Sequence, residues 1–266
     1  MKLNNVLLIG CLVVTPLVLV QTAAAQNGTP SSKATAAINT GVSCTFSFAS
    51  NLGDPPPQTC HDIFTGFPVF VSADNFATVM SSTIKVSNSQ SLFVSPSLVT
   101  GLYTQTKTST RTGTTSTAVG QGGVYLRAIV TNQATGVKQI GYPAAACLPG
   151  VLGCQQASNG DFGVTLDSRI QTLTQAISEC IVTIAGVTAG TCDFTSTIDL
   201  ILNTTSAHTF NFIFPSVGVG VYTVEIQAAF NSGASVSGFG TATGAAAYGL
   251  GSLTVESVRL VHDFVF

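Results

Sequence analysis

Apolar and polar side chains alternate with a period of two along several stretches of this chain, and this pattern restricts the fold more than any other feature. In "VYTVEIQAAF" (221–230) every second residue from Tyr222 to Phe230 is apolar. The same alternation occurs in 82–87, 122–130 and 208–214. A period of two is typical of strands with one buried face, as in antiparallel sheets. Segments with turn-forming residues separate these stretches, at 132–136, 158–160, 215–220 and 231–233.

Three segments need separate interpretation. In "STIDLILNTTSAH" (196–208) the apolar residues Ile198, Ile201 and Leu202 follow helical spacing, with Ser196 as a cap and Asp199 in the first turn, so we predict a short helix. Residues 168–181 also have helical apolar spacing, but their threonine content favours a strand. In 253–260 the apolar parity changes, which predicts a β-bulge near Glu256–Ser257.

Threonine occupies almost every second position of "TQTKTSTRTGTTST" (104–117). Its β-branched side chain suits a pleated backbone. We therefore expect two strand ends joined by a turn near Thr112–Thr114, extending beyond the core into water. The alternative is a lattice of hydroxyl groups that binds ice or a crystal surface, but a flat face of that kind needs several stacked ranks and the chain offers one.

The N-terminus has the features of an export signal. Lys2 provides a positive charge, residues 6–20 are mostly apolar, and Ala23–Ala25 forms a cleavage site of small residues. The apolar run is shorter than the ~20 residues of a membrane-spanning helix, so no transmembrane helix is expected in the mature chain. The segment "LIGC", ending at Cys11, resembles a lipoprotein signal, but the apolar run continues beyond it. We predict a signal peptide over 1–25, a flexible leader over 26–64 and a β-sandwich domain over 65–266.

The cysteines outside the signal peptide are even in number, which in an exported chain predicts disulfides. The first pair lies in the leader, around a run of three prolines that forbids a central strand. Many pairings are open on sequence alone, and pairing of nearest neighbours is the simplest: Cys44 with Cys60, Cys147 with Cys154, and Cys180 with Cys192. Zinc is the competing interpretation, but no CxxC motif and no histidine at ligand spacing accompanies them.

The charge content argues against several classes of function. Charged residues make up 8% of the chain and the formal net charge is −2, so neither nucleic acid nor an anionic membrane is an expected partner. The sequence contains no G-x-S-x-G, H-E-x-x-H, Walker A or G-x-G-x-x-G motif. Its histidines, His61, His208 and His262, fall in no recognisable catalytic arrangement. We predict no catalytic residue, cofactor or metal site.

Five segments together resemble a set of exported bacterial β-sandwich proteins of unknown function. They are "STIKVSNSQSLFVSPSLVTGLYTQT", "STAVGQGGVYLRAIV", "IDLILNTTSAHTFNF", "GVYTVEIQAAF" and "GSLTVESVRLV". The resemblance covers about residues 80–262 and implies the fold and an exported location. No catalytic motif comes with it.

These observations predict an all-β protein: one disulfide-bonded antiparallel β-sandwich, jelly-roll or Ig-like, of roughly ten strands with one short helix. We expect a secreted, non-catalytic protein with a structural or interaction role, whose partner is a glycan or another extracellular protein. One alternative is a carbohydrate-binding module, although the chain has no Trp; the candidate ligand-facing aromatics are Tyr103, Tyr125, Tyr142 and Tyr248. Another is an outer-membrane or surface-assembled protein that uses its Phe-ending C-terminal strand, "VRLVHDFVF".

Overall fold

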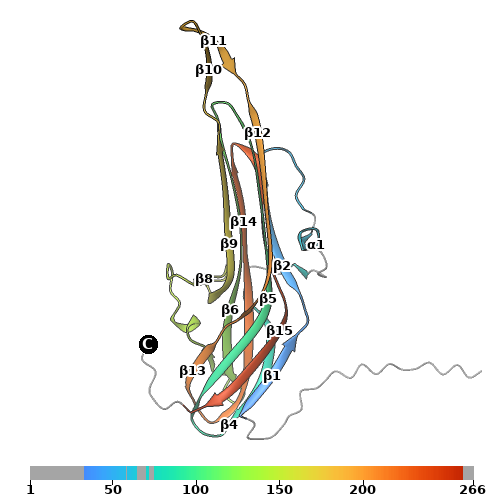
Figure 1. Ribbon diagram of the computed structural model, residues 1–266. Coiled ribbons are helices and arrows are strands. Elements are labelled where there is room, and N and C mark those ends of the chain that lie inside the picture. The colour runs from blue at the N-terminus through green and yellow to red at the C-terminus, as the bar shows by residue number, and fades with distance from the viewer. Residues whose placement is uncertain (1–32, 58, 65–69, 72–74, 260–266) are drawn as a thin grey trace, which may run out of the picture. The chain divides into compact units, whose positions relative to one another are not determined.

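The computed structural model describes residues 33–57, 59–64, 70–71 and 75–259 (Figure 1). The predicted signal peptide, the first residues of the predicted leader, and the part of the predicted C-terminal strand from Leu260 on, including His262, lie outside these residues. Within them the chain forms fifteen strands in antiparallel ladders, apart from one short parallel pairing. The predicted all-β sandwich is confirmed, with more strands than the ten expected.

Seven strands form one sheet, called sheet A. It contains β1 (Ala34–Asn39), β2 (Ser43–Ser50), β3 (Phe70–Val71), β5 (Gln90–Arg111), β12 (Thr195–Thr209), β13 (Phe212–Val217) and β15 (Phe239–Val258). Its order is β12-β5-β15-β2-β3, with β1 paired to β15 and β13 paired to β5. Strand β12 therefore forms one edge of sheet A, because β5 is its neighbour on one side only.

Six strands form the opposing sheet, called sheet B. It contains β4 (Ala77–Val86), β6 (Thr115–Asn132), β7 (Lys138–Ile140), β8 (Cys154–Gln156), β9 (Phe162–Ala176) and β14 (Gly220–Ser237). Its order is β4-β14-β6-β9-β8, with β7 paired to β6. A separate hairpin of β10 (Cys180–Ile184) and β11 (Val187–Cys192) connects β9 to β12, and Figure 1 shows it beyond the ends of those strands.

An apolar core fills one part of the space between the sheets. The period-two segments supply it as predicted, since one face of each is almost fully buried. The largest buried side chains are Ile84, Leu92, Leu98, Leu126, Phe212, Phe214, Ile226 and Leu253. Burial of such side chains drives folding, at about 1.5–3 kcal/mol each relative to exposure.

A second part of the interior has no room for large side chains, because the backbone of β15 in sheet A touches the backbone of β6 in sheet B. A Cβ added to Gly122 of β6 would lie 2.9 Å from the carbonyl carbon of Ala245 in β15. A Cβ added to Gly244 of β15 would lie 2.6 Å from the backbone nitrogen of Gln121 in β6. Sheets of a sandwich usually stand ~10 Å apart with interdigitated side chains. Here glycine on both sheets permits direct contact.

The threonine-rich segment turns where the sequence predicts but is not exposed. Strand β5 ends at Arg111 and β6 begins at Thr115, and the intervening turn carries the chain from sheet A to sheet B. The prediction that this stretch extends into water is wrong: alternate threonines of β5 are fully buried, namely Thr104, Thr106, Thr108 and Thr110. Their hydroxyl groups form hydrogen bonds with side chains of the opposing sheet, and these bonds offset the free-energy cost of burying them.

Two predictions of secondary structure are wrong. Residues 195–209 form strand β12 instead of a helix, and all of them pair with β5. Their apolar residues mimic helical spacing because both faces of this edge strand are partly exposed, so no single face determines the pattern.

The predicted flexible leader is wrong over residues 34–50, which form β1 and β2; their Ala, Ser and Thr side chains fit beside the small residues of β15. The only α-helix in the described residues is α1 (Cys60–Ile63).

Two local predictions also fail, while the strand prediction for 168–181 holds over β9. Residues 231–233 continue β14 instead of turning, because they pair with Gly123–Gln121 of β6. The β-bulge predicted near Glu256–Ser257 is misplaced. The pairing of β15 with β5 is regular at these two residues, and its register shifts between Gly249 and Gly251 instead. Leu250, at that point, has a φ of 34°.

Candidate functional site

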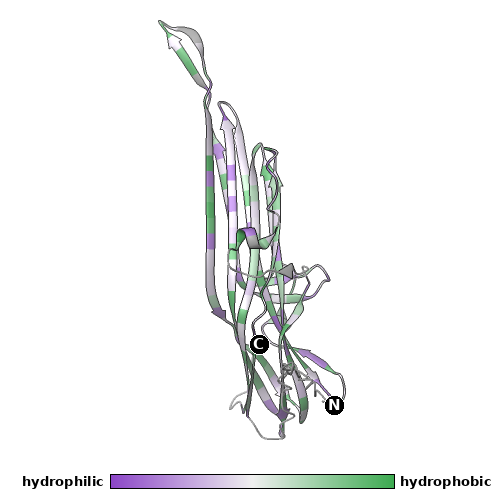
Figure 2. Ribbon diagram, turned by 90° about the vertical axis from the view of Figure 1, so that its right-hand side faces the viewer, coloured by the Kyte–Doolittle hydropathy of each residue, from purple (hydrophilic) through white to green (hydrophobic). Residues whose placement is uncertain are grey.

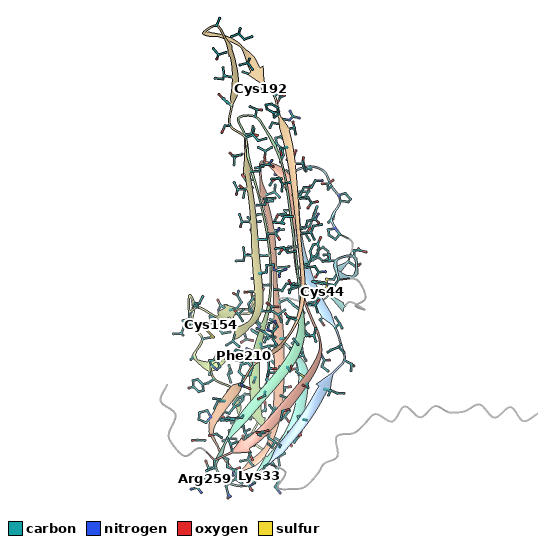
Figure 3. All side chains as sticks on the ribbon, viewed as in Figure 1. Lys33, Cys44, Cys154, Cys192, Phe210 and Arg259 are labelled. Atoms are coloured by element: carbon teal, nitrogen blue, oxygen red, sulfur yellow. A yellow bond between two sulfur atoms is a disulfide. The ribbon has the colours of Figure 1, made fainter. Side chains whose placement is uncertain are left out.

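Two of the predicted disulfides are present. Cys44 pairs with Cys60, with a Cα–Cα distance of 6.4 Å, and Cys147 pairs with Cys154 at 5.5 Å. Cys180 and Cys192 are Cα partners across β10 and β11, and Cys192 is disulfide-bonded. Figure 3 shows Cys44 and Cys154 in two separate parts of the sandwich, and Cys192 at the β10–β11 hairpin. Each predicted pair joins a local loop, and the first two indicate an oxidising compartment.

A ladder of buried and half-buried polar side chains joins β5 of sheet A to β9 of sheet B, and we call it the polar seam. It comprises Thr100, Thr104, Thr106, Thr108 and Thr110 with Asp167, Arg169, Gln171 and Gln175. Partners are 67 residues apart in Thr100 with Asp167 and in Thr108 with Gln175, and 65 residues apart in Thr106 with Gln171. Every buried side-chain nitrogen or oxygen of the described residues has a hydrogen-bond partner.

Gln171 is the most connected member of the seam. Its Oε1 accepts from the Thr104 hydroxyl, and its Nε2 donates to the Thr106 hydroxyl at 2.7 Å and to the Leu200 carbonyl of β12 at 2.9 Å. One amide thus joins three strands. Arg169 does the same through the Leu102 carbonyl and the Thr204 hydroxyl.

The seam ends in a cluster that has the composition, but not the geometry, of a catalytic triad. The Ser206 hydroxyl lies 2.7 Å from Nε2 of His208, and Asp167 Oδ2 lies 3.4 Å from the same nitrogen. In a triad the carboxylate binds Nδ1 and orients the ring, so that Nε2 is free to take the serine proton. Here carboxylate and hydroxyl share one nitrogen, and Asp167 also accepts from Thr100 at 2.7 Å. The cluster holds β5, β9 and β12 together.

His61, another of the three histidines, lies next to Asp62 in α1. Asp62 accepts a hydrogen bond from the backbone of Thr59 at 3.0 Å and forms a capping box with it, which is a structural role. The His61 side chain lies outside the described part of the chain. Within that part, no group of three or more His, Cys, Asp or Glu residues is arranged to hold a metal ion.

The four candidate tyrosines do not form a shared exposed platform. Tyr248 is buried in the core and stacks on Phe230, with ring centroids 4.7 Å apart. Tyr125 is also buried, but on the outer face of sheet B, where it lines a cavity. Tyr103 is half-buried, and its hydroxyl donates to Gln105 at 3.0 Å. Burial raises the pKa of all three phenols. Tyr142 is half-buried beside Ile213.

A cavity of about 420 Å³ lies on the outer face of sheet B. Its walls are the loop that the Cys147–Cys154 disulfide closes, together with side chains of β6, β9 and β14. A smaller cavity of about 140 Å³ shares Tyr125, Gln155 and Asn231 with it. We call the two together the amide groove. Apart from Tyr125, no sequence pattern indicates the groove, because one wall is a loop that lies against the sheet.

An ion pair anchors the loop that follows this disulfide. The Arg127 guanidinium donates to Asp161 at 2.8 Å and to Gln227 at 2.8 Å, and it lies 4.6 Å from the centre of the Phe76 ring. The hydrogen bond from Arg127 holds the pKa of Asp161 below its ordinary value of 3.8.

This depressed pKa predicts an acid-dependent loss of stability. A carboxylate with a lowered folded-state pKa stabilises the fold above its unfolded-state pKa, and the stabilisation disappears as the pH falls through the folded-state value. Asp161→Asn should therefore cost about 0.5–1 kcal/mol of unfolding free energy at about pH 7 and progressively less as the pH falls below the ordinary aspartate pKa of 3.8, measured by urea denaturation. The exposed Asp193→Asn is the control, and an effect that does not change with pH would contradict the prediction.

Strand β12 exposes apolar side chains along an open sheet edge. Ile198, Leu200, Ile201 and Leu202 are each more than 40% exposed, and Figure 2 shows hydrophobic colour along this strand at the margin of the view. Edge strands in soluble proteins are usually protected by lysine, proline, a bulge or a covering segment. In β12 none of these is present among the described residues, and its one acidic residue, Asp199, accepts from Gln105. Sequence reasoning missed this surface because it assigned the segment to a helix.

Comparison with known proteins adds no family. No family model matches the chain, and a search of the curated proteins found no match. Among solved structures, the chain is similar to one from "Structure of infectious bursal disease virus Gx strain", with 12% identity and a TM-score of 0.21. That match covers 85% of this chain and 38% of the other. The chain thus spans well under half of the length of that structure, and the TM-score is too low to carry an argument. No helix in the described residues is long and apolar enough to span a membrane.

Proposed function

We propose that this protein is an exported, non-catalytic β-sandwich that assembles with copies of itself through the open edge of β12. The observation that carries the proposal is the row of exposed apolar side chains on an unprotected edge strand. The ionisable cluster nearest to it, around His208, is committed to holding strands together. The disulfides support export, because such bonds persist in oxidising compartments.

The edge is complementary to itself. When two β12 strands pair antiparallel about Leu200, that residue meets its own copy and Ile198 meets Leu202. Asp199 then lies opposite Ile201, so no two carboxylates face each other. Apolar cross-strand pairs stabilise a sheet by about 0.2–1 kcal/mol each, and a twofold arrangement closes without leaving a further open edge at this interface.

The experiment compares the mass in solution of the mature chain with that of two variants. Ile201→Lys combined with Leu202→Lys places charge on the exposed edge and should convert a dimer to a monomer in light scattering. Ile38→Lys is the matched control: it places a charge on an exposed apolar side chain of β1, outside the proposed interface, and the variant should remain dimeric. A wild-type monomer at all concentrations, or a dimer that survives both lysines, would contradict the proposal.

Export is tested separately. The protein recovered from the periplasm or the medium should begin at Gln26, as N-terminal sequencing would show, and thiol titration without reductant should find no free cysteine. Recovery from the cytoplasm with an intact N-terminus would count against export and leave the assembly test unaffected.

A further inference from the structure

The amide groove has the chemistry of a binding site, and it lies on the outer face of sheet B, whereas β12 belongs to sheet A. Its larger cavity, about 420 Å³, falls within the range of ~300–1,000 Å³ typical of small-molecule sites. The Cys147–Cys154 disulfide fixes one wall, since Cys154 itself lines the cavity. The site is therefore preformed.

Two glycines lie next to side chains that line the groove, Tyr125 and Gln121. A Cβ on Gly123 would lie 2.9 Å from Cζ of Tyr125, and a Cβ on Gly233 would lie 2.8 Å from Cγ of Gln121. Any larger residue at these positions would lift those side chains from the sheet. Because both positions are glycine, the phenol ring and the amide lie flat against the backbone and leave the space above them open.

The groups that line the groove define the ligand. Amides of Gln121, Gln155 and Asn231 both donate and accept hydrogen bonds, as hydroxyl groups do. Arg169, the one charged residue among the described residues that line the groove, is already bound to Leu102 and Thr204 of sheet A. Apolar side chains of the rim, Leu152 and Ile170, are strongly exposed. Such a surface suits a neutral molecule with many hydroxyl groups and some C–H faces.

We propose that the amide groove binds a short neutral saccharide, a mono- or disaccharide, with the amides on its hydroxyls and the apolar rim on its C–H face. This inference does not rest on self-assembly. It also differs from an exposed tyrosine platform, because Tyr125 forms the floor and the amides provide recognition.

The test is titration calorimetry of the full mature chain with a panel of neutral mono- and disaccharides, with sialic acid as an anionic control. At least one neutral sugar should bind, and the association constant should fall at least tenfold in Gln121→Ala and in Asn231→Ala. Gln139→Ala removes an exposed amide from β7 of the same sheet and should bind as the wild type does. Thermal unfolding of each variant verifies that it is folded.

Three results would overturn the proposal. The first is the absence of binding by any neutral sugar at millimolar concentration. The second is binding that Gln121→Ala and Asn231→Ala leave unchanged. The third is selective binding of sialic acid, of a fatty acid or of an extended peptide in the groove, since each would assign the site to another ligand. A monomeric wild-type protein that still binds sugar would refute self-assembly alone.

Discussion

Gly244→Ala should largely prevent the two sheets from closing. The added Cβ would lie 2.6 Å from the backbone nitrogen of Gln121 and 2.5 Å from the carbonyl oxygen of Gly233. Both are backbone atoms of ladders that cannot shift alone, so the whole of sheet B would have to move. Overpacking usually costs about 1–3 kcal/mol when side chains can adjust. Here they cannot, and we expect a loss of about 4 kcal/mol or failure to fold, measured by circular dichroism during urea denaturation.

Gly190→Ala is the matched control, because no heavy atom lies within 4 Å of a Cβ built at that glycine of β11. Its unfolding free energy should change by no more than about 0.5 kcal/mol. If Gly244→Ala were as stable as this control, the sheets would not be in backbone contact at β6 and β15, and the description of this part of the interior would be wrong.

Gln171→Leu should have the second largest effect. It preserves the approximate size of the side chain but leaves the hydroxyls of Thr104 and Thr106 and the carbonyl of Leu200 without their partner. A buried polar group without a hydrogen bond costs about 1–3 kcal/mol. Because Thr104 and Thr106 are both fully buried, we expect a combined loss of about 3 kcal/mol in the free energy of unfolding.

The same substitution at Gln139, an exposed glutamine of β7, should be nearly neutral. Addition of Thr104→Val and Thr106→Val to Gln171→Leu should restore most of the loss, since apolar groups that replace both partners of a hydrogen bond remove the desolvation penalty. If the triple variant were less stable than Gln171→Leu alone, the energetics assigned to the polar seam would be incorrect.

Much of the fold could be predicted from the sequence, where burial on one face leaves a period of two. The core positions of β4, β6 and β14 follow directly from that pattern, as in Ile84, Val124 and Ile226. The turn near Gly113 and the disulfides Cys44–Cys60 and Cys147–Cys154 follow from local chemistry. These features depend on residues close together in the chain, which sequence patterns report well.

The misassigned segments depend on what lies opposite each strand. Hydrophobicity scales predict that the threonines at 104–110 are exposed. Their burial is favourable only because Gln171 and Gln175 of β9 form hydrogen bonds with their hydroxyl groups. Strand β12 lacks a buried face to set a period, so its isoleucines and leucines were compatible with a helix. The amide groove depends on the loop at 150–153 lying beside Gln121, Tyr125 and Asn231 of sheet B, and no local pattern reports that arrangement.

The polar seam has a thermal consequence. Exposure of apolar surface raises the heat capacity on unfolding, whereas exposure of polar surface lowers it. A sandwich that fills part of its interior with threonine and glutamine should unfold with a heat capacity increment below the usual ~12–15 cal/mol/K per residue. Its stability curve would then be flatter, and the protein would lose less of its stability on cooling than a sandwich with a wholly apolar interior. Tolerance of cold surroundings would follow from the side chains that this chain buries.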